Sequence, residues 1–148
     1  MKFEIQPYVS IGPLKWGMSN QEVGLLLGPA IKVTKNRMGS IIEFRNQYTQ
    51  SFIYDSNLNL IEVTFSKTLE ICCSRGIDLL ETPSDKVISA LINIDKGAVM
   101  GYDSIIFQEI GVALTGFMPE DLEIRAAGAF SVGRWDSLIP TMTPFHFI

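Results

Sequence analysis

The sequence predicts an α+β fold in which two units, each a helix followed by an antiparallel meander, form one twisted antiparallel sheet with the helices packed on one face. Three observations lead to this prediction. Two segments, 19–29 and 82–95, carry signals for the start or the end of a helix. Each is followed by three runs that are rich in β-branched and aromatic residues. The chain has 148 residues, of which 47% are hydrophobic, and this is enough for one domain, 1–148, with its own core.

The first predicted helix begins after Ser19. Ser19 and Glu22 match the S-x-x-E capping box, and Gly28 followed by Pro29 ends the helix. The residues that share its apolar face are Val23, Leu26 and Leu27. The glycines and the lysine of this region match neither a P-loop nor a dinucleotide-binding fingerprint, because their spacing differs from both. We therefore interpret the segment as a capped helix and not as a phosphate-binding loop.

The second predicted helix repeats this design. Thr82 is the expected N-cap, Pro83 the first helical residue, and Asp85 completes a T-x-x-D box. Its expected apolar face consists of Val87, Ala90, Leu91 and Ile94. One shift of the chain that places the first helix on the second also aligns the strand patterns, which predicts an internal repeat of units 11–67 and 75–131.

The predicted strands alternate with polar turns. They span 40–46, 48–55 and 60–66 in the first unit and 103–109, 111–118 and 122–130 in the second. Two more short strands are expected around Gly76, and the tail with Pro140 and Pro144 is expected to be extended. The pattern leaves open which face of the sheet is buried in each unit.

The segments GMSNQEVGLLLGP, IIEFRN and SFIYDSNLNLIEVTF together resemble the unit of the outer-membrane assembly lipoprotein BamE. Two such units in tandem resemble the β-lactamase inhibitor protein. The chain departs from both families, since it has no lipobox cysteine near its start and no cysteine pair that would staple each unit. It is also similar to small bacterial proteins with an IGPLKxGMS opening, here 11–19, and with motifs like 76–82 and 109–116. These proteins resemble immunity partners of polymorphic toxins. The resemblance implies a fold and a class of function, but it transfers no functional residue.

Composition excludes several classes of function. The formal net charge is −4 and no basic stripe is present, which argues against a nucleic-acid partner. No apolar run has the length of a membrane span, and we expect a cytoplasmic protein. Cys72 and Cys73 are adjacent, so we expect two reduced thiols on opposite faces of a strand. His146 is the single histidine and lies in the tail, so we expect neither catalysis nor a metal or cofactor site.

The remaining hypothesis is a protein-binding module, namely a cytoplasmic immunity or inhibitor protein that neutralises a bacterial toxin with a basic domain. Its candidate contact residues are the aromatic strand face and the acidic turn: Tyr48, Phe52, Tyr54, Glu120, Asp121 and Glu123. Core packing of the aromatic residues and a solvated turn are the competing interpretations. The alternative function is a small-ligand or sensor domain with a pocket between sheet and helices. The oligomeric state is left open.

Overall fold

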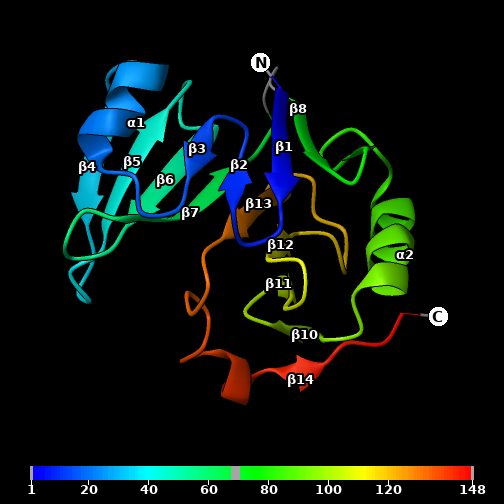
Figure 1. Cartoon of the computed structure of the whole chain (residues 1–148). Helices are drawn as coiled ribbons and strands as arrows, with labels where there is room; N and C mark the ends of the chain where they lie inside the picture. Colours follow the sequence, from blue (N-terminus) through cyan, green and yellow to red (C-terminus); the bar gives the residue numbers. More distant parts are fainter. Residues whose placement is uncertain (1, 68–70, 148) are drawn as a thin grey trace.

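The computed structural model describes residues 2–67 and 71–147, which form an α+β structure with mostly antiparallel sheets (Figure 1). The elements up to residue 67 are β1 (Lys2–Gln6), β2 (Ser10–Ile11), β3 (Leu14–Lys15), α1 (Asn20–Leu27), β4 (Lys32–Lys35), β5 (Ile41–Arg45), β6 (Gln50–Tyr54) and β7 (Leu60–Phe65). Those that follow are β8 (Ile71–Ser74), β9 (Ile77–Asp78), α2 (Ser84–Ile94), β10 (Ala98–Gly101), β11 (Ser104–Phe107), β12 (Val112–Thr115), β13 (Ala126–Phe130), the 3₁₀-helix η1 (Ile139–Thr141) and β14 (Thr143–Pro144).

The strands form two sheets instead of the single sheet that the sequence predicted. The larger sheet has nine strands in the order β14-β10-β11-β12-β13-β7-β6-β5-β4, and its pairs are antiparallel. The smaller sheet has the order β3-β2-β1-β8-β9, with β1 and β8 parallel. The two short strands that were expected around Gly76 are confirmed as β8 and β9, but the prediction missed β1, β2 and β3. β2 and β3 have two residues each, too few for a periodic signal.

The nine-stranded sheet is continuous because β7 pairs with β13 in its middle. Thr64 lies opposite Gly128 in this pair. A Cβ atom at Gly128 would lie 2.0 Å from the carbonyl oxygen of Val63, so the backbones can approach in this way only around a glycine.

The first helix confirms its predicted cap. The N–H of Glu22 donates to Oγ of Ser19 at 3.1 Å, and the N–H of Ser19 donates to Oε1 of Glu22 at 3.1 Å. Gly28 ends the helix with φ at +87°, a conformation that favours glycine. Val23 is buried and Leu27 packs against the core, but Leu26 is exposed, so the apolar face is narrower than predicted.

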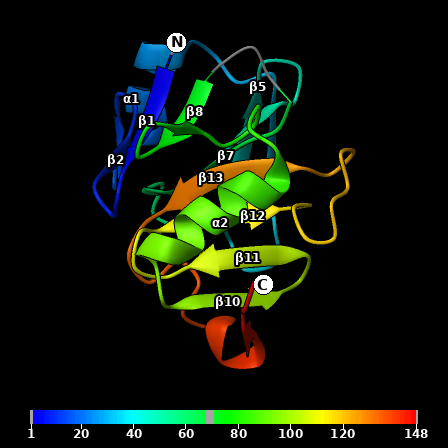
Figure 2. The same cartoon turned by 90° about the vertical axis from the view of Figure 1, so that its right-hand side faces the viewer.

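The second helix lacks the predicted capping box. Pro83 occupies the N-cap position, no side chain caps the helix, and the first helical residue is Ser84. The carbonyl of Thr82 instead accepts a hydrogen bond from Arg125 at 2.5 Å. Val87, Ile88 and Leu91 are the buried apolar side chains of α2, so Ile88 replaces Ala90 and Ile94 in the predicted face. Figure 2 shows α2 lying across the strands of the second half of the large sheet.

The core lies between the large sheet, α2 and the small sheet. Phe3 of β1 contacts Phe65 of β7, with 4.7 Å between ring centroids. Cys72 of β8 belongs to this core, and Cys73 is buried without being part of it, which agrees with opposite faces of one strand. Most predicted strands are confirmed with shorter bounds. The run 122–130 becomes a strand only at Ala126, because its first residues belong to a long loop.

Candidate protein-interaction surface

The three aromatic candidates do not form an exposed face. Phe52 and Tyr54 have no exposed surface and belong to the hydrophobic core, which corrects their proposed role in contacting a partner. Tyr48 is 57% exposed, but it lies in the turn before β6 with φ at +69° and not on the strand. Its ring packs against Phe44, with 5.7 Å between centroids. The alternation of residues was predicted correctly, but it marks the inner face of β6.

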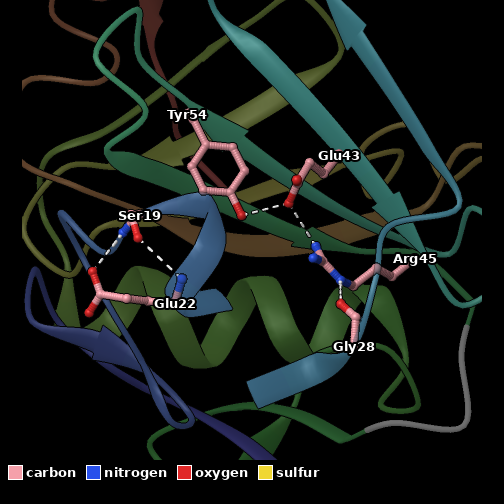
Figure 3. Close-up of polar contacts among 6 residues, drawn as sticks. All are labelled: Ser19, Glu22, Gly28, Glu43, Arg45 and Tyr54. Atoms are coloured by element: carbon pink, nitrogen blue, oxygen red, sulfur yellow. Dashed lines mark hydrogen bonds and ion pairs between the residues drawn. The ribbon is translucent and has the colours of Figure 1, made fainter. Parts of the chain in front are cut away.

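Tyr54 belongs to a buried polar network between α1 and the sheet (Figure 3). Its hydroxyl donates to Oε1 of Glu43 at 2.8 Å, and Nη1 of Arg45 donates to the same oxygen at 2.9 Å. Nε of Arg45 donates to the carbonyl of Gly28, at the end of α1, at 3.0 Å. Burial and the hydrogen bond to Glu43 raise the pKa of Tyr54. The network thus ties the end of α1 to β5 and β6.

The three acidic candidates do come together on an exposed loop between β12 and β13. Glu120, Asp121 and Glu123 are all exposed. Two apolar side chains lie among them, Leu122 at 70% exposure and Ile124 at 45%. This loop, residues 116–125, projects from the body of the protein (Figure 2). We call it the acidic loop. It combines negative charge with exposed apolar surface.

Hydrogen bonds within the acidic loop define its shape. The N–H of Asp121 donates to the carbonyl of Gly116 at 2.9 Å. The N–H of Glu123 donates to Oδ1 of Asp121 at 3.0 Å. Gly116 has φ at +72°, and a Cβ atom there would lie 2.8 Å from the N atom of Arg125. Both the conformation and the space at residue 116 therefore require glycine.

Arg125 anchors the end of the acidic loop to the segment before α2. Its Nη2 donates to the carbonyls of Leu79 at 2.9 Å and Thr82 at 2.5 Å. Its guanidinium lies over the ring of Phe117, 4.3 Å from the centroid. Arg125 keeps its positive charge in these contacts, and the loop stays acidic because its three carboxylates outnumber this one arginine. Sequence reasoning missed this role, because nothing in the pattern marks Arg125 as paired with residues more than 40 positions away.

A small cleft adjoins the acidic loop. It has a volume of about 230 Å³ and is lined by Lys67, Leu80, Glu81, Leu122 and Arg125. Its lining combines basic, acidic and apolar side chains, a composition that suits the binding of a side chain from a partner protein.

Other reactive groups lie apart from the acidic loop. His146 is exposed and lines a groove between α2 and the tail. Burial raises the pKa of Cys72 and of Cys73, which disfavours a thiolate nucleophile at either position. Within residues 2–67 and 71–147, no group of histidine, cysteine and carboxylate side chains is placed to hold a metal ion.

Asp95 is a buried carboxylate that sequence reasoning did not single out. It ends α2, where Oδ1 accepts from the N–H of Gly97 at 2.8 Å. Oδ2 accepts from the N–H groups of Glu109 at 2.8 Å and Ile110 at 3.0 Å. Burial nevertheless raises its pKa. A signal was present in the sequence, because an aspartate at a helix C-terminus opposes the helix dipole and needs another partner.

Glu62 of β7 is a further buried carboxylate. Oε1 of Glu62 accepts from Nε of Arg134 at 2.7 Å. Arg134 also lies over the ring of Trp135, 5.6 Å from its centroid. The pair attaches the segment after β13 to β7, and burial raises the pKa of Glu62. Both buried carboxylates are therefore used in holding the fold together.

No family model, no curated protein and no solved structure matches the chain. In the part of the chain that the structure describes, neither helix has the length and apolar character that crossing a membrane would require.

Proposed function

We propose that the protein is a non-enzymatic binding module of the immunity or inhibitor type, which neutralises a bacterial toxin in the cytoplasm. The observation that carries this proposal is the acidic loop, where three carboxylates and two apolar side chains are exposed together. The resemblance of the sequence to tandem inhibitor units and to small immunity proteins points to the same class.

The acidic loop has the properties of a protein contact. Glu120, Asp121 and Glu123 would attract a basic partner and orient it. Leu122 and Ile124 would supply the apolar area that such contacts bury. Because the loop is already ordered by Gly116 and Arg125, binding would cost little conformational entropy. A basic toxin domain is therefore the class of partner that this loop would fit.

We infer further that residues 11–67 and 75–131 are two repeats, with both helices on one face of the large sheet. The pairing of β7 with β13 supports this, since Thr64 and Gly128 lie opposite each other and are also equivalent under the shift that aligns the helices. Such a pair would lie on a local two-fold axis. The central strands β7 and β13 bury side chains in the same core as the two helices: Val63, Phe65, Ala127 and Ala129. This supports a position of both helices on the same face of the large sheet.

The alternative function, small-ligand binding, has its best support in the groove between α2 and the tail. This groove has a volume of about 450 Å³, within the range of a typical ligand site of about 300–1,000 Å³, whereas the cleft beside the acidic loop has about 230 Å³. The aromatic side chains that were expected to line a pocket, Phe52 and Tyr54, fill the core instead. We favour a protein partner because the acidic loop exposes charged and apolar side chains together.

The proposed function is tested by using the tagged protein to capture its binding partner from lysates of the organism that produces both. The tagged wild type is compared with a variant in which Glu120→Gln, Asp121→Asn and Glu123→Gln remove three charges. Asp121→Asn retains the Oδ1 acceptor for the N–H of Glu123, so the loop is expected to keep its shape. A double variant, Asp85→Asn with Asp103→Asn, changes exposed carboxylates elsewhere and is the control.

The proposal predicts a stoichiometric basic partner that is toxic when expressed alone. Its recovery should fall at least about tenfold with the loop variant and stay unchanged with the control, as expected when close charge pairs are removed. Failure to find such a partner, or equal recovery with all three proteins, would refute the assignment of function to this loop.

A further inference from the structure

Strand β4 is the most accessible edge of the two sheets. The sheets end at β14, β4, β3 and β9, and within the described residues β4 has four residues while each of the others has two. β14 also contains Pro144, which cannot donate a backbone hydrogen bond. β4 pairs with β5 on one side and with no described strand on the other. Figure 1 shows it at the outer margin of the large sheet.

The pairing register tells which backbone groups of β4 face outward. The N–H of Asn36 donates to the carbonyl of Ser40 at 3.0 Å, and Thr34 lies opposite Ile42 in the same register. Hydrogen-bonded and non-hydrogen-bonded pairs alternate along an antiparallel pair. Val33 and Lys35 therefore turn their N–H and C=O groups away from β5, where an added strand could bind them.

One face of this edge carries apolar side chains next to the basic Lys35. Val33 lies opposite Glu43, so it is on the sheet face that α1 partly covers. Val33 is 59% exposed, and Ile31, just before the strand, is also exposed. In α1, Leu25 is 88% exposed. Apolar side chains thus remain uncovered on both the strand and the helix that leads into it.

The charge of this region is opposite to that of the whole protein. Residues 23–42 contain no aspartate or glutamate, although the formal net charge of the chain is −4. Lys32, Lys35 and Arg37 are all exposed. This charge disfavours a second copy as the occupant, because an antiparallel pairing of β4 with itself would bring the basic side chains of the two copies close together.

We propose that β4 is a docking edge, which binds an extended acidic segment of a partner protein as a further strand of the large sheet. Backbone hydrogen bonds to Val33 and Lys35 would hold the segment, and its acidic side chains would pair with the basic residues. The segment would place apolar side chains beside Ile31 and Val33. This edge and the acidic loop are separate surfaces with opposite charge, so the proposal for one of them can be refuted without affecting the proposal for the other.

The test selects binders from a displayed library of random peptides long enough to span β4. An enriched peptide is then titrated against the wild type, Val33→Pro and Val33→Thr. Val33→Pro removes one outward N–H, and the hydrogen bonds of β4 to β5 are expected to stay intact. Val33→Thr keeps the N–H and the branched shape, so it is the matched control. Circular dichroism melting verifies that all three proteins fold.

The proposal predicts enriched peptides that combine acidic and apolar residues. Their affinity should fall at least about tenfold with Val33→Pro, stay within about twofold with Val33→Thr, and be unaffected by neutralising the acidic loop. Absence of enrichment, basic peptides, or equal affinity for both Val33 variants would overturn it. So would vesicles of phosphatidylcholine and phosphatidylserine that bind the wild type and Val33→Pro equally, since this would indicate a membrane surface.

Discussion

Glu62 and Asp95 illustrate how single residues hold this fold together. Each is a buried carboxylate whose oxygen atoms accept hydrogen bonds from a segment distant in the sequence. In each case donors of the protein replace water as hydrogen-bond partners of the carboxylate. Burial nevertheless raises the pKa of both carboxyl groups. The buried carboxylates are therefore the groups through which pH acts on stability.

Glu62→Gln should change the pH dependence of stability. The pKa of Glu62 is raised above its ordinary value of 4.5, so the unfolded chain loses this proton at a lower pH than the folded protein does. The free energy of unfolding of the wild type therefore falls as pH rises above about 4.5, until the pH exceeds the raised pKa. Glutamine lacks this contribution and still offers an acceptor to Arg134.

Urea unfolding between about pH 4 and pH 7 measures this difference. The stability of Glu62→Gln relative to the wild type should increase with pH. Glu123→Gln, which changes an exposed carboxylate, should follow the wild-type curve. A difference between Glu62→Gln and the wild type that is constant or decreases over this range would show that Arg134 fully compensates the burial of Glu62.

The candidate residues were predictable to different degrees. The acidic loop was found because carboxylates clustered in a turn are exposed in most proteins. Phe52 and Tyr54 were misplaced because alternation tells that two residues share a face, but it does not tell whether that face is inside. In β13, the buried residues Ala127 and Ala129 are too weakly apolar to show from the sequence which face of the sheet is inside.

At the scale of elements, the two helices differ in how they begin. α1 uses a complete capping box at Ser19, whereas α2 follows Pro83 and has no side-chain cap. The sequence pattern was similar in both cases. The start of α2 also has a tertiary hydrogen bond, from Arg125 to the carbonyl of Thr82, which sequence spacing does not reveal.

Ser19→Ala and Thr82→Ala form a matched pair of substitutions. Ser19→Ala should lower the free energy of unfolding by about 1 kcal/mol, because the N–H of Glu22 loses its acceptor. Thr82→Ala should change it by less than about 0.5 kcal/mol, because it retains the carbonyl that Arg125 binds. Chemical denaturation of both variants checks this. Equal losses would show that Thr82 caps α2 in solution.

At the scale of the whole molecule, the halves are joined through β7 and β13. The meander strands were predictable because their apolar runs are long enough to show a period. The small sheet was not, since the parallel pairing of β1 with β8 joins segments about 70 residues apart. Only tertiary packing, such as the contact of Phe3 with Phe65, brings these strands together.

Gly128→Ala tests the importance of this junction. Its Cβ atom would overlap the carbonyl oxygen of Val63, so we expect a loss of more than about 3 kcal/mol or a failure to fold. Gly24→Ala is the comparison, because its nearest contact would be an ordinary 3.9 Å to Nη2 of Arg45. In a helix it should stabilise by about 0.5–1 kcal/mol. Thermal unfolding of both variants measures these changes in stability. A loss of stability with Gly128→Ala well below this value would contradict the close pairing of β7 with β13.

The binding role of the acidic loop is tested by the affinity of the captured partner for the wild type and for the loop variant with Glu120→Gln, Asp121→Asn and Glu123→Gln. Isothermal titration at low and at raised salt gives both dissociation constants. We predict that the loop variant binds at least about tenfold more weakly at low salt and that raised salt reduces this difference. Equal affinity of the two proteins at both salt concentrations would contradict the claim that the acidic loop binds the partner.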